Sequence, residues 1–113
     1  EQREVQMHLL ALEGQASIQG AMGLCHEEMR TRTRQREVAE AARKDEVTTD
    51  ERLLSHHGLV LAHLRACDGP AAGAAAREGL AAAAAEGSAL GEAVFKVHLM
   101  AASLVGNEEA WRG

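Results

Sequence analysis

The stretch "GAAAREGLAAAAAEGSALGEAVFKVHLMAASL", residues 73–104, decides the fold class of this chain. Its small and apolar residues recur at alternating steps of three and four, which is the spacing of a coiled-coil seam. This pattern predicts one long helix over about residues 71–111, in which the Ala- and Gly-lined first half lets a neighbouring backbone approach closely. The seam consists of Gly73, Ala76, Leu80, Ala83, Gly87, Leu90, Val94, Val97, Ala101 and Leu104, and its register reaches Trp111.

The composition of the 113-residue chain also indicates helices. Phe95 and Trp111 are its only aromatic residues, and Pro70 is its only proline. Ala, Leu, Glu, Arg and Gln, which favour helix, outnumber the β-branched and aromatic residues that favour strands. We therefore expect one all-α domain over residues 1–113, as a fragment of a larger protein.

The charge balance and the hydropathy argue against nucleic-acid and membrane partners. The net charge is −5, from 12 basic and 17 acidic residues. A nucleic-acid-binding protein would carry a basic face, and attraction to anionic lipid also needs basic clusters. No apolar run approaches the roughly 18 residues of a membrane span.

Two further helices are expected before the seam. The first covers about residues 2–43, where apolar residues follow 4-3-4 spacing in two registers. Its glycines each weaken the helix by about 1 kcal/mol relative to alanine, so we expect a bend or break near residues 14–23. The second covers about residues 49–67 and begins after Thr48, which forms a capping box with Glu51.

The turn into the third helix completes an elongated antiparallel three-helix bundle with coiled-coil-like packing. Gly69 suits the left-handed position at the end of the second helix, and Pro70 suits the first turn of the third. The short middle helix cannot cover both long neighbours, so an apolar stripe on the third helix needs another cover. We expect the first helix, folded back, a second copy or another protein to bury it. The stripe consists of Val94, Val97, Leu104 and Trp111.

The two cysteines are predicted to form a disulfide. In an antiparallel hairpin of the first two helices, Cys25 and Cys67 lie at the same level to within about 3 Å. A disulfide between them is typical of an extracellular or cell-surface protein. Two alternatives stay open: two free buried thiols, or a zinc site formed by both cysteines with His26 and His63.

Two short pieces of the chain resemble the helical copper- and nickel-sensing repressors. These pieces are "LEGQASIQGAM" (residues 12–22) and "HLRAC" (residues 63–67). The resemblance implies a ligand pair of His63 and Cys67 in an intracellular metal-responsive bundle. The chain departs from that pattern because Cys25 falls out of place for a third ligand and the basic residues for DNA are missing.

The chain as a whole is similar in style to the helical surface proteins of trypanosomes. Long Ala-rich helices, very few aromatic residues, a shorter middle helix and a helix-to-helix cysteine pair carry this resemblance, and no motif does. The resemblance implies a non-enzymatic extracellular or cell-surface domain that acts in a coat, as an antigen or in partner binding. An intracellular metal-responsive or adaptor bundle is the alternative.

No catalytic or cofactor motif is present in the sequence. The serines lack the Gly-x-Ser-x-Gly elbow of a hydrolase. The glycine-rich "EGSALGE", residues 86–92, lies inside the helical seam rather than between a strand and a helix, so it is not a phosphate loop. We therefore expect no enzyme activity and no cofactor or metal.

Overall fold

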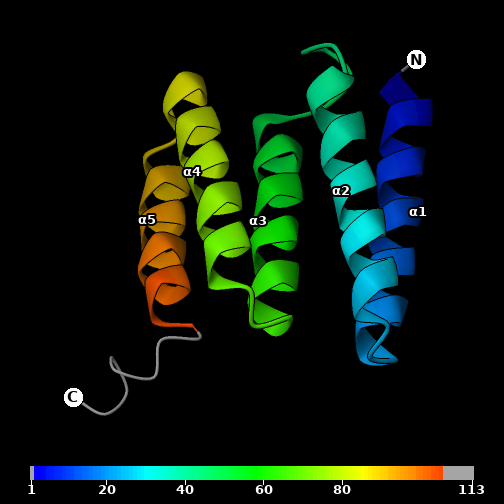
Figure 1. Ribbon diagram of the computed structural model, residues 1–113. Coiled ribbons are helices and arrows are strands. Elements are labelled where there is room, and N and C mark those ends of the chain that lie inside the picture. The colour runs from blue at the N-terminus through cyan, green and yellow to red at the C-terminus, as the bar shows by residue number, and fades with distance from the viewer. Residues whose placement is uncertain (1, 106–113) are drawn as a thin grey trace.

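The computed structural model describes residues 2–105, and these form five α-helices (Figure 1). The all-α prediction is confirmed, and no strand occurs in this part of the chain. The prediction of three helices is wrong, because the predicted first and third helices each divide into two. The helices are α1 (Gln2–Ala21), α2 (Cys25–Ala41), α3 (Thr49–Arg65), α4 (Gly69–Glu86) and α5 (Ala89–Leu104).

A glycine in the left-handed conformation lies at each of the two breaks that divide the predicted first and third helices. Gly23, between α1 and α2, has φ 73°, and Gly87, at the end of α4, has φ 70°. A glycine adopts this conformation without the strain that a side chain would cause. Ser88 then caps α5 by accepting a hydrogen bond from the Gly91 N–H at 3.0 Å. The chain therefore reverses at Gly87, inside the predicted seam.

The ends of α3 lie close to where the sequence predicts them. Thr48 and Glu51 form the expected capping box at its start. At the other end the left-handed residue is Cys67, with φ 57°, rather than Gly69. Gly69 instead allows the start of α4 to lie close to the end of α5, because a Cβ at this position would lie 2.7 Å from the carbonyl oxygen of Ala102.

The five helices stand side by side in an open row, and each packs on the next along the chain (Figure 1). The row measures 51 × 34 × 16 Å, so it is long and thin. α1 and α5 lie at opposite edges, and α3 and α5 touch only slightly. An array of this kind holds together through contacts between neighbours, as repeat proteins do.

Two separate apolar clusters form the core. The larger cluster joins α3, α4 and α5, and the smaller one joins α1, α2 and the loop before α3. The buried members of the larger cluster are Leu53, Leu59, Val60, Ala75, Ala76, Ala83 and Phe95. Those of the smaller cluster are Leu9, Ala39 and Val47.

Between the two clusters, the interface of α2 with α3 is largely polar. The buried carboxylate of Glu28 on α2 pairs with Arg65 on α3. The buried His56 on α3 pairs with Glu40 on α2. Gly58 on α3 allows the buried Arg32 to lie close, since a Cβ at this position would be 3.1 Å from its guanidinium.

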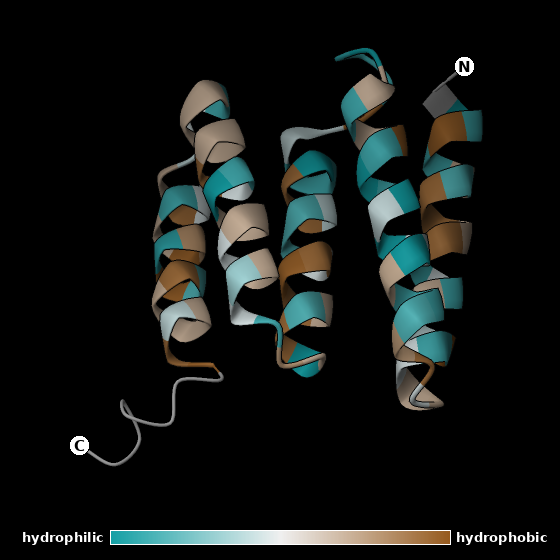
Figure 2. Ribbon diagram, in the orientation of Figure 1, coloured by the Kyte–Doolittle hydropathy of each residue, from teal (hydrophilic) through white to brown (hydrophobic). Residues whose placement is uncertain are grey.

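The seam is buried in its first half only. Ala76 and Ala83 on α4 are fully buried, but Leu90 and Val97 on α5 are 78% and 61% exposed. After the reversal at Gly87, α5 turns a different face inward, centred on Phe95, which is 1% exposed. Figure 2 shows hydrophobic residues along α5, the outermost helix of the row.

The predicted cover of the apolar stripe by the folded-back first helix of the same chain is wrong. α1 lies at the far edge of the row from α5 and cannot reach the stripe (Figure 1). Val97 and Leu104 are exposed, and Val94 is half-buried. Trp111, the last member of the predicted stripe, lies outside the described residues.

Candidate protein interaction surface

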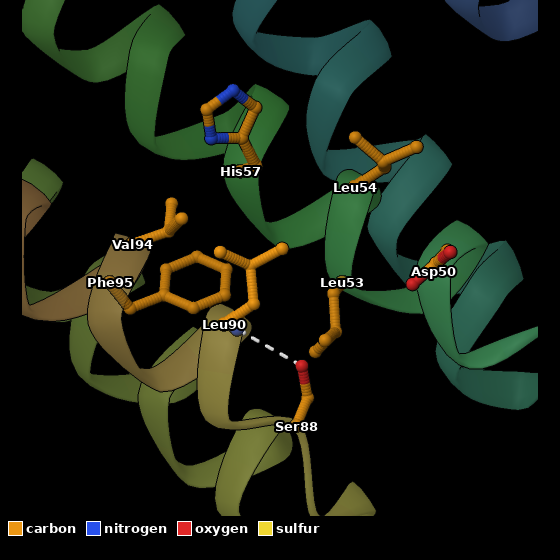
Figure 3. A pocket seen from close by; sticks show the side chains of 9 residues that line it. Asp50, Leu53, Leu54, His57, Ser88, Leu90, Val94 and Phe95 are labelled. Atoms are coloured by element: carbon orange, nitrogen blue, oxygen red, sulfur yellow. Dashed lines mark hydrogen bonds between the residues drawn. The ribbon is translucent and has the colours of Figure 1, made fainter.

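Residues of α1, α3 and α5 line two grooves on one face of the row. The first groove lies between α3 and α5 (Figure 3). The groove has a volume of about 400 Å³. Its position over α4 follows from the slight contact between α3 and α5, whose side chains leave the space unfilled. The groove is lined by Asp50, Leu53, Leu54, His57, Ser88, Leu90, Gly91, Val94 and Phe95.

The walls of this groove are mostly apolar. Leu53 and Leu54 of α3 face Leu90 and Phe95 of α5 across it (Figure 3). Leu54 is 62% exposed, and Leu90 is even more so, while Phe95 forms the closed floor. Aliphatic side chains left in water next to a hollow are typical of a binding surface rather than of a filled core.

Two polar residues stand on α3 at different levels of the groove. Asp50 lies in the first turn of α3, and His57 lies two turns further on. The rise of 1.5 Å per residue places them about 10 Å apart along the helix axis. The groove is therefore long enough for about two turns of a bound helix.

A second groove, between α1 and α3, continues the same face. Its volume is about 460 Å³, and it shares Leu54 with the first groove. Leu9 and Leu10 of α1 supply its apolar wall, and Gln35 of α2 contributes from beneath. Leu54 is thus the ridge between two adjoining grooves on one face.

A hydrogen-bonded network fixes the polar side of the second groove. The carboxylate of Glu13 accepts hydrogen bonds from Arg32 at 2.5 Å and from Gln35 at 3.0 Å. The hydrogen bond from Arg32, aided by that from Gln35, lowers the pKa of Glu13 from 4.5 to about 2. Glu13 is therefore charged near pH 7, and the network ties α1 to α2.

The opposite face of the row is polar by comparison. Arg36 of α2 and Glu78 of α4 form an ion pair at 2.5 Å that spans α3. Arg52 of α3 lies 3.6 Å from Glu86 of α4 and donates to the carbonyl oxygen of Ala42 at 3.0 Å. Both grooves, with the exposed Leu10, Leu54 and Leu90 that line them, thus belong to the α1/α3/α5 face.

Both cysteines are exposed and free in the structure, without the bond predicted between them. Their register is close to the prediction, because Cys25 and His26 at the start of α2 share a small pocket with His63 and Asp68 near the end of α3. Over residues 2–105, no group of three or more His, Cys, Asp or Glu side chains is placed to hold a metal ion.

The groove was not foreseen from the sequence, because it depends on the reversal of the chain at Gly87. A signal was present in the dipeptide of Gly87 and Ser88. Glycine is favoured just after a helix, and serine is favoured as the cap that starts the next. The uninterrupted seam outweighed this local signal.

None of the described helices is both long and apolar enough to cross a membrane. No protein family model, curated protein or solved structure matches the chain.

Proposed function

We propose that the chain is a non-enzymatic interaction domain that binds a protein partner through α5 and the groove between α3 and α5. The exposed apolar edge of α5 is the observation that carries this proposal. Leu90, Val97 and Met100 are each more than half exposed on this edge helix, and Leu104 continues the stripe. A helix at the edge of the row that packs mainly on α4 leaves such a stripe in contact with water.

The shape of the surface favours a helical partner. The groove runs along α3 and α5 and is apolar except for Asp50, His57 and Ser88. An amphipathic helix fills a groove of this kind with apolar side chains spaced three and four residues apart. Asp50, which is exposed, would favour a basic residue on the partner near the first turn of α3.

We include in this proposal a location outside the cell or on its surface, where the domain acts in a coat or as an antigen. One feature supports this location. That feature is the predicted bond between Cys25 and Cys67, which would form in an oxidising compartment. An intracellular adaptor would use the same groove with both thiols free. The redox state of the two cysteines in isolated protein therefore distinguishes the two locations.

Site-specific photo-crosslinking in the native cell tests the interaction surface. A photoreactive residue at Leu90, which is 78% exposed, should give a discrete protein adduct. The matched control places the same residue at Ala84, which is exposed on α4 and does not line the groove. The adduct at position 90 should disappear when Leu54→Asp puts a charge on the opposite wall.

Equal adducts at positions 84 and 90, or an adduct that is unchanged by Leu54→Asp, would contradict the proposal. The exposed side chain of Leu54 makes this substitution mild for folding, and circular dichroism of the variant checks that point. Light scattering of the purified chain then shows whether the partner is a second copy or a different protein.

A further inference from the structure

A pair of histidines joins α3 to α5 beside the groove. The Nδ1 atom of His57 on α3 lies 2.8 Å from the Nε2 atom of His98 on α5. The two rings are stacked, with centroids 4.9 Å apart and planes inclined at 28°. α3 and α5 touch only slightly, and this pair is one of the contacts between them.

Both imidazoles are in the form that binds metal ions. Burial lowers the pKa of His57 and of His98, and the proximity of His57 lowers the pKa of His98 further. Both rings are therefore neutral near pH 7, and a 2.8 Å contact between neutral rings is an N–H···N hydrogen bond. One nitrogen of the facing pair already presents its lone pair, and the other does so after a change of tautomer.

Charges of both signs lie near the pair. The guanidinium of Arg32 on α2 lowers the pKa of His57, and the carboxylate of Glu13 on α1 raises it. These two groups are paired with each other at 2.5 Å. Beside His98, Phe95 presents its ring at a centroid distance of 5.9 Å and carries no charge. A cation that approaches the pair therefore meets a paired guanidinium and carboxylate on one side and an uncharged ring on the other.

We propose that His57 and His98 bind a divalent transition-metal ion, of which Zn²⁺ is the type, between Nδ1 of His57 and Nε2 of His98. The ring that donates the hydrogen bond moves its proton to its other nitrogen, so the ion takes the place of the shared proton without net release. Zinc–nitrogen bonds of about 2.0–2.1 Å at a tetrahedral angle require the nitrogens to be about 3.3 Å apart. The rings need to separate by only about half an ångström.

The chemistry of the pair selects the class of metal. Two imidazoles without a carboxylate suit zinc, copper or nickel, and do not suit magnesium or calcium, which prefer oxygen ligands. Water fills the remaining positions, because both histidines are only half-buried. The bound ion holds α3 and α5 at a fixed spacing and so sets the width of the groove that His57 lines.

Calorimetric titration of the purified chain with zinc chloride at pH 7.5 tests this site. The parent protein carries Cys25→Ser and Cys67→Ser, because the exposed thiols would themselves bind zinc. We expect one zinc ion per chain and a rise in melting temperature. His98→Gln, which keeps a hydrogen-bonding group beside His57, should abolish both effects.

The matched control is His8→Gln, which removes an exposed histidine from α1 and should leave the titration unchanged. Circular dichroism confirms that each variant is folded. Zinc binding that persists at the same affinity in His98→Gln overturns the proposal. An absence of both heat and thermal stabilisation in the parent protein overturns it as well.

Discussion

Gly79 offers the sharpest test of how α4 and α5 pack, through the single substitution Gly79→Ala. A Cβ at this position would lie 2.4 Å from one ring atom of Phe95 and 2.6 Å from two others. The ring is 1% exposed and belongs to the larger apolar cluster, so moving it disturbs the core packed around it. The absence of a side chain at Gly79 is therefore what allows Phe95 to enter the core.

The change in the free energy of unfolding caused by Gly79→Ala is the sum of two opposing contributions. Overpacking a filled core costs about 1–3 kcal/mol, and so severe an overlap with a buried ring places the cost near the upper end. Replacing glycine by alanine inside a helix stabilises the helix by about 1 kcal/mol. The net loss should be about 2 kcal/mol, which lowers the melting temperature of a domain of this size by roughly 10 °C.

Gly14→Ala is the matched control, because the same atom is added inside α1 with nothing within 4 Å of it. This variant should gain up to about 1 kcal/mol and raise the melting temperature by roughly 5 °C. Thermal and urea unfolding monitored by circular dichroism measure both variants. If Gly79→Ala stabilises the protein as Gly14→Ala does, the described contact between α4 and Phe95 is wrong.

Three further predictions concern a cap, an ionised carboxylate and the cysteines. Thr48→Ala should cost about 1 kcal/mol in urea unfolding, since it removes the capping hydrogen bond to the Glu51 N–H; an unchanged urea midpoint would argue against the capping box. Because the pKa of Glu13 is lowered to about 2, its charge stabilises the fold fully above pH 4.5, and this contribution is lost as the pH falls from 4.5 towards 2. The stability difference between the wild type and Glu13→Gln should therefore shrink over that range, and a constant difference would refute the assignment. If Cys25 and Cys67 are bonded, neither reacts with iodoacetamide in protein isolated without reductant, whereas two adducts in the intact mass would end the argument for an extracellular location.

The helical class and several local features could be predicted from the sequence, because they depend on residues close together in the chain. The capping box at Thr48 and the position of Pro70 are fixed by neighbours within one helical turn. The glycines also predict the break near residues 14–23, and it occurs at Gly23. Such features need no knowledge of the rest of the fold.

The direction of the chain after Gly87 could not be predicted from the seam. A continuous 3-4 pattern is compatible with one long helix and also with two helices that bury different faces. In the structure α5 buries Phe95 and Ala102, which lie off the seam, and exposes Leu90 and Val97, which lie on it. Contacts between helices, such as the packing of Phe95 on Gly79, decide between these outcomes.

The histidine pair could not be predicted from the sequence for the same reason. His57 and His98 are 41 residues apart in the chain, and no spacing rule relates them. They meet because the chain reverses at Gly87 and brings α5 back beside α3. A model with one helix over residues 71–111 would carry His98 far from His57.

The polar interface between α2 and α3 has a consequence for the dynamics of the chain. The α1–α2 hairpin has its own apolar cluster, and few apolar side chains other than Met29 connect it to the larger one. Amide hydrogen exchange should therefore show two cooperative units, with α1 and α2 opening at a lower free energy than α3 and α4. Such an opening exposes the side of α3 that carries His56. The groove between α3 and α5 keeps its shape, because its lining residues lie on α3 and α5 and in the turn before α5. Detachment of the hairpin thus creates a transient second surface on α3 without loss of the first.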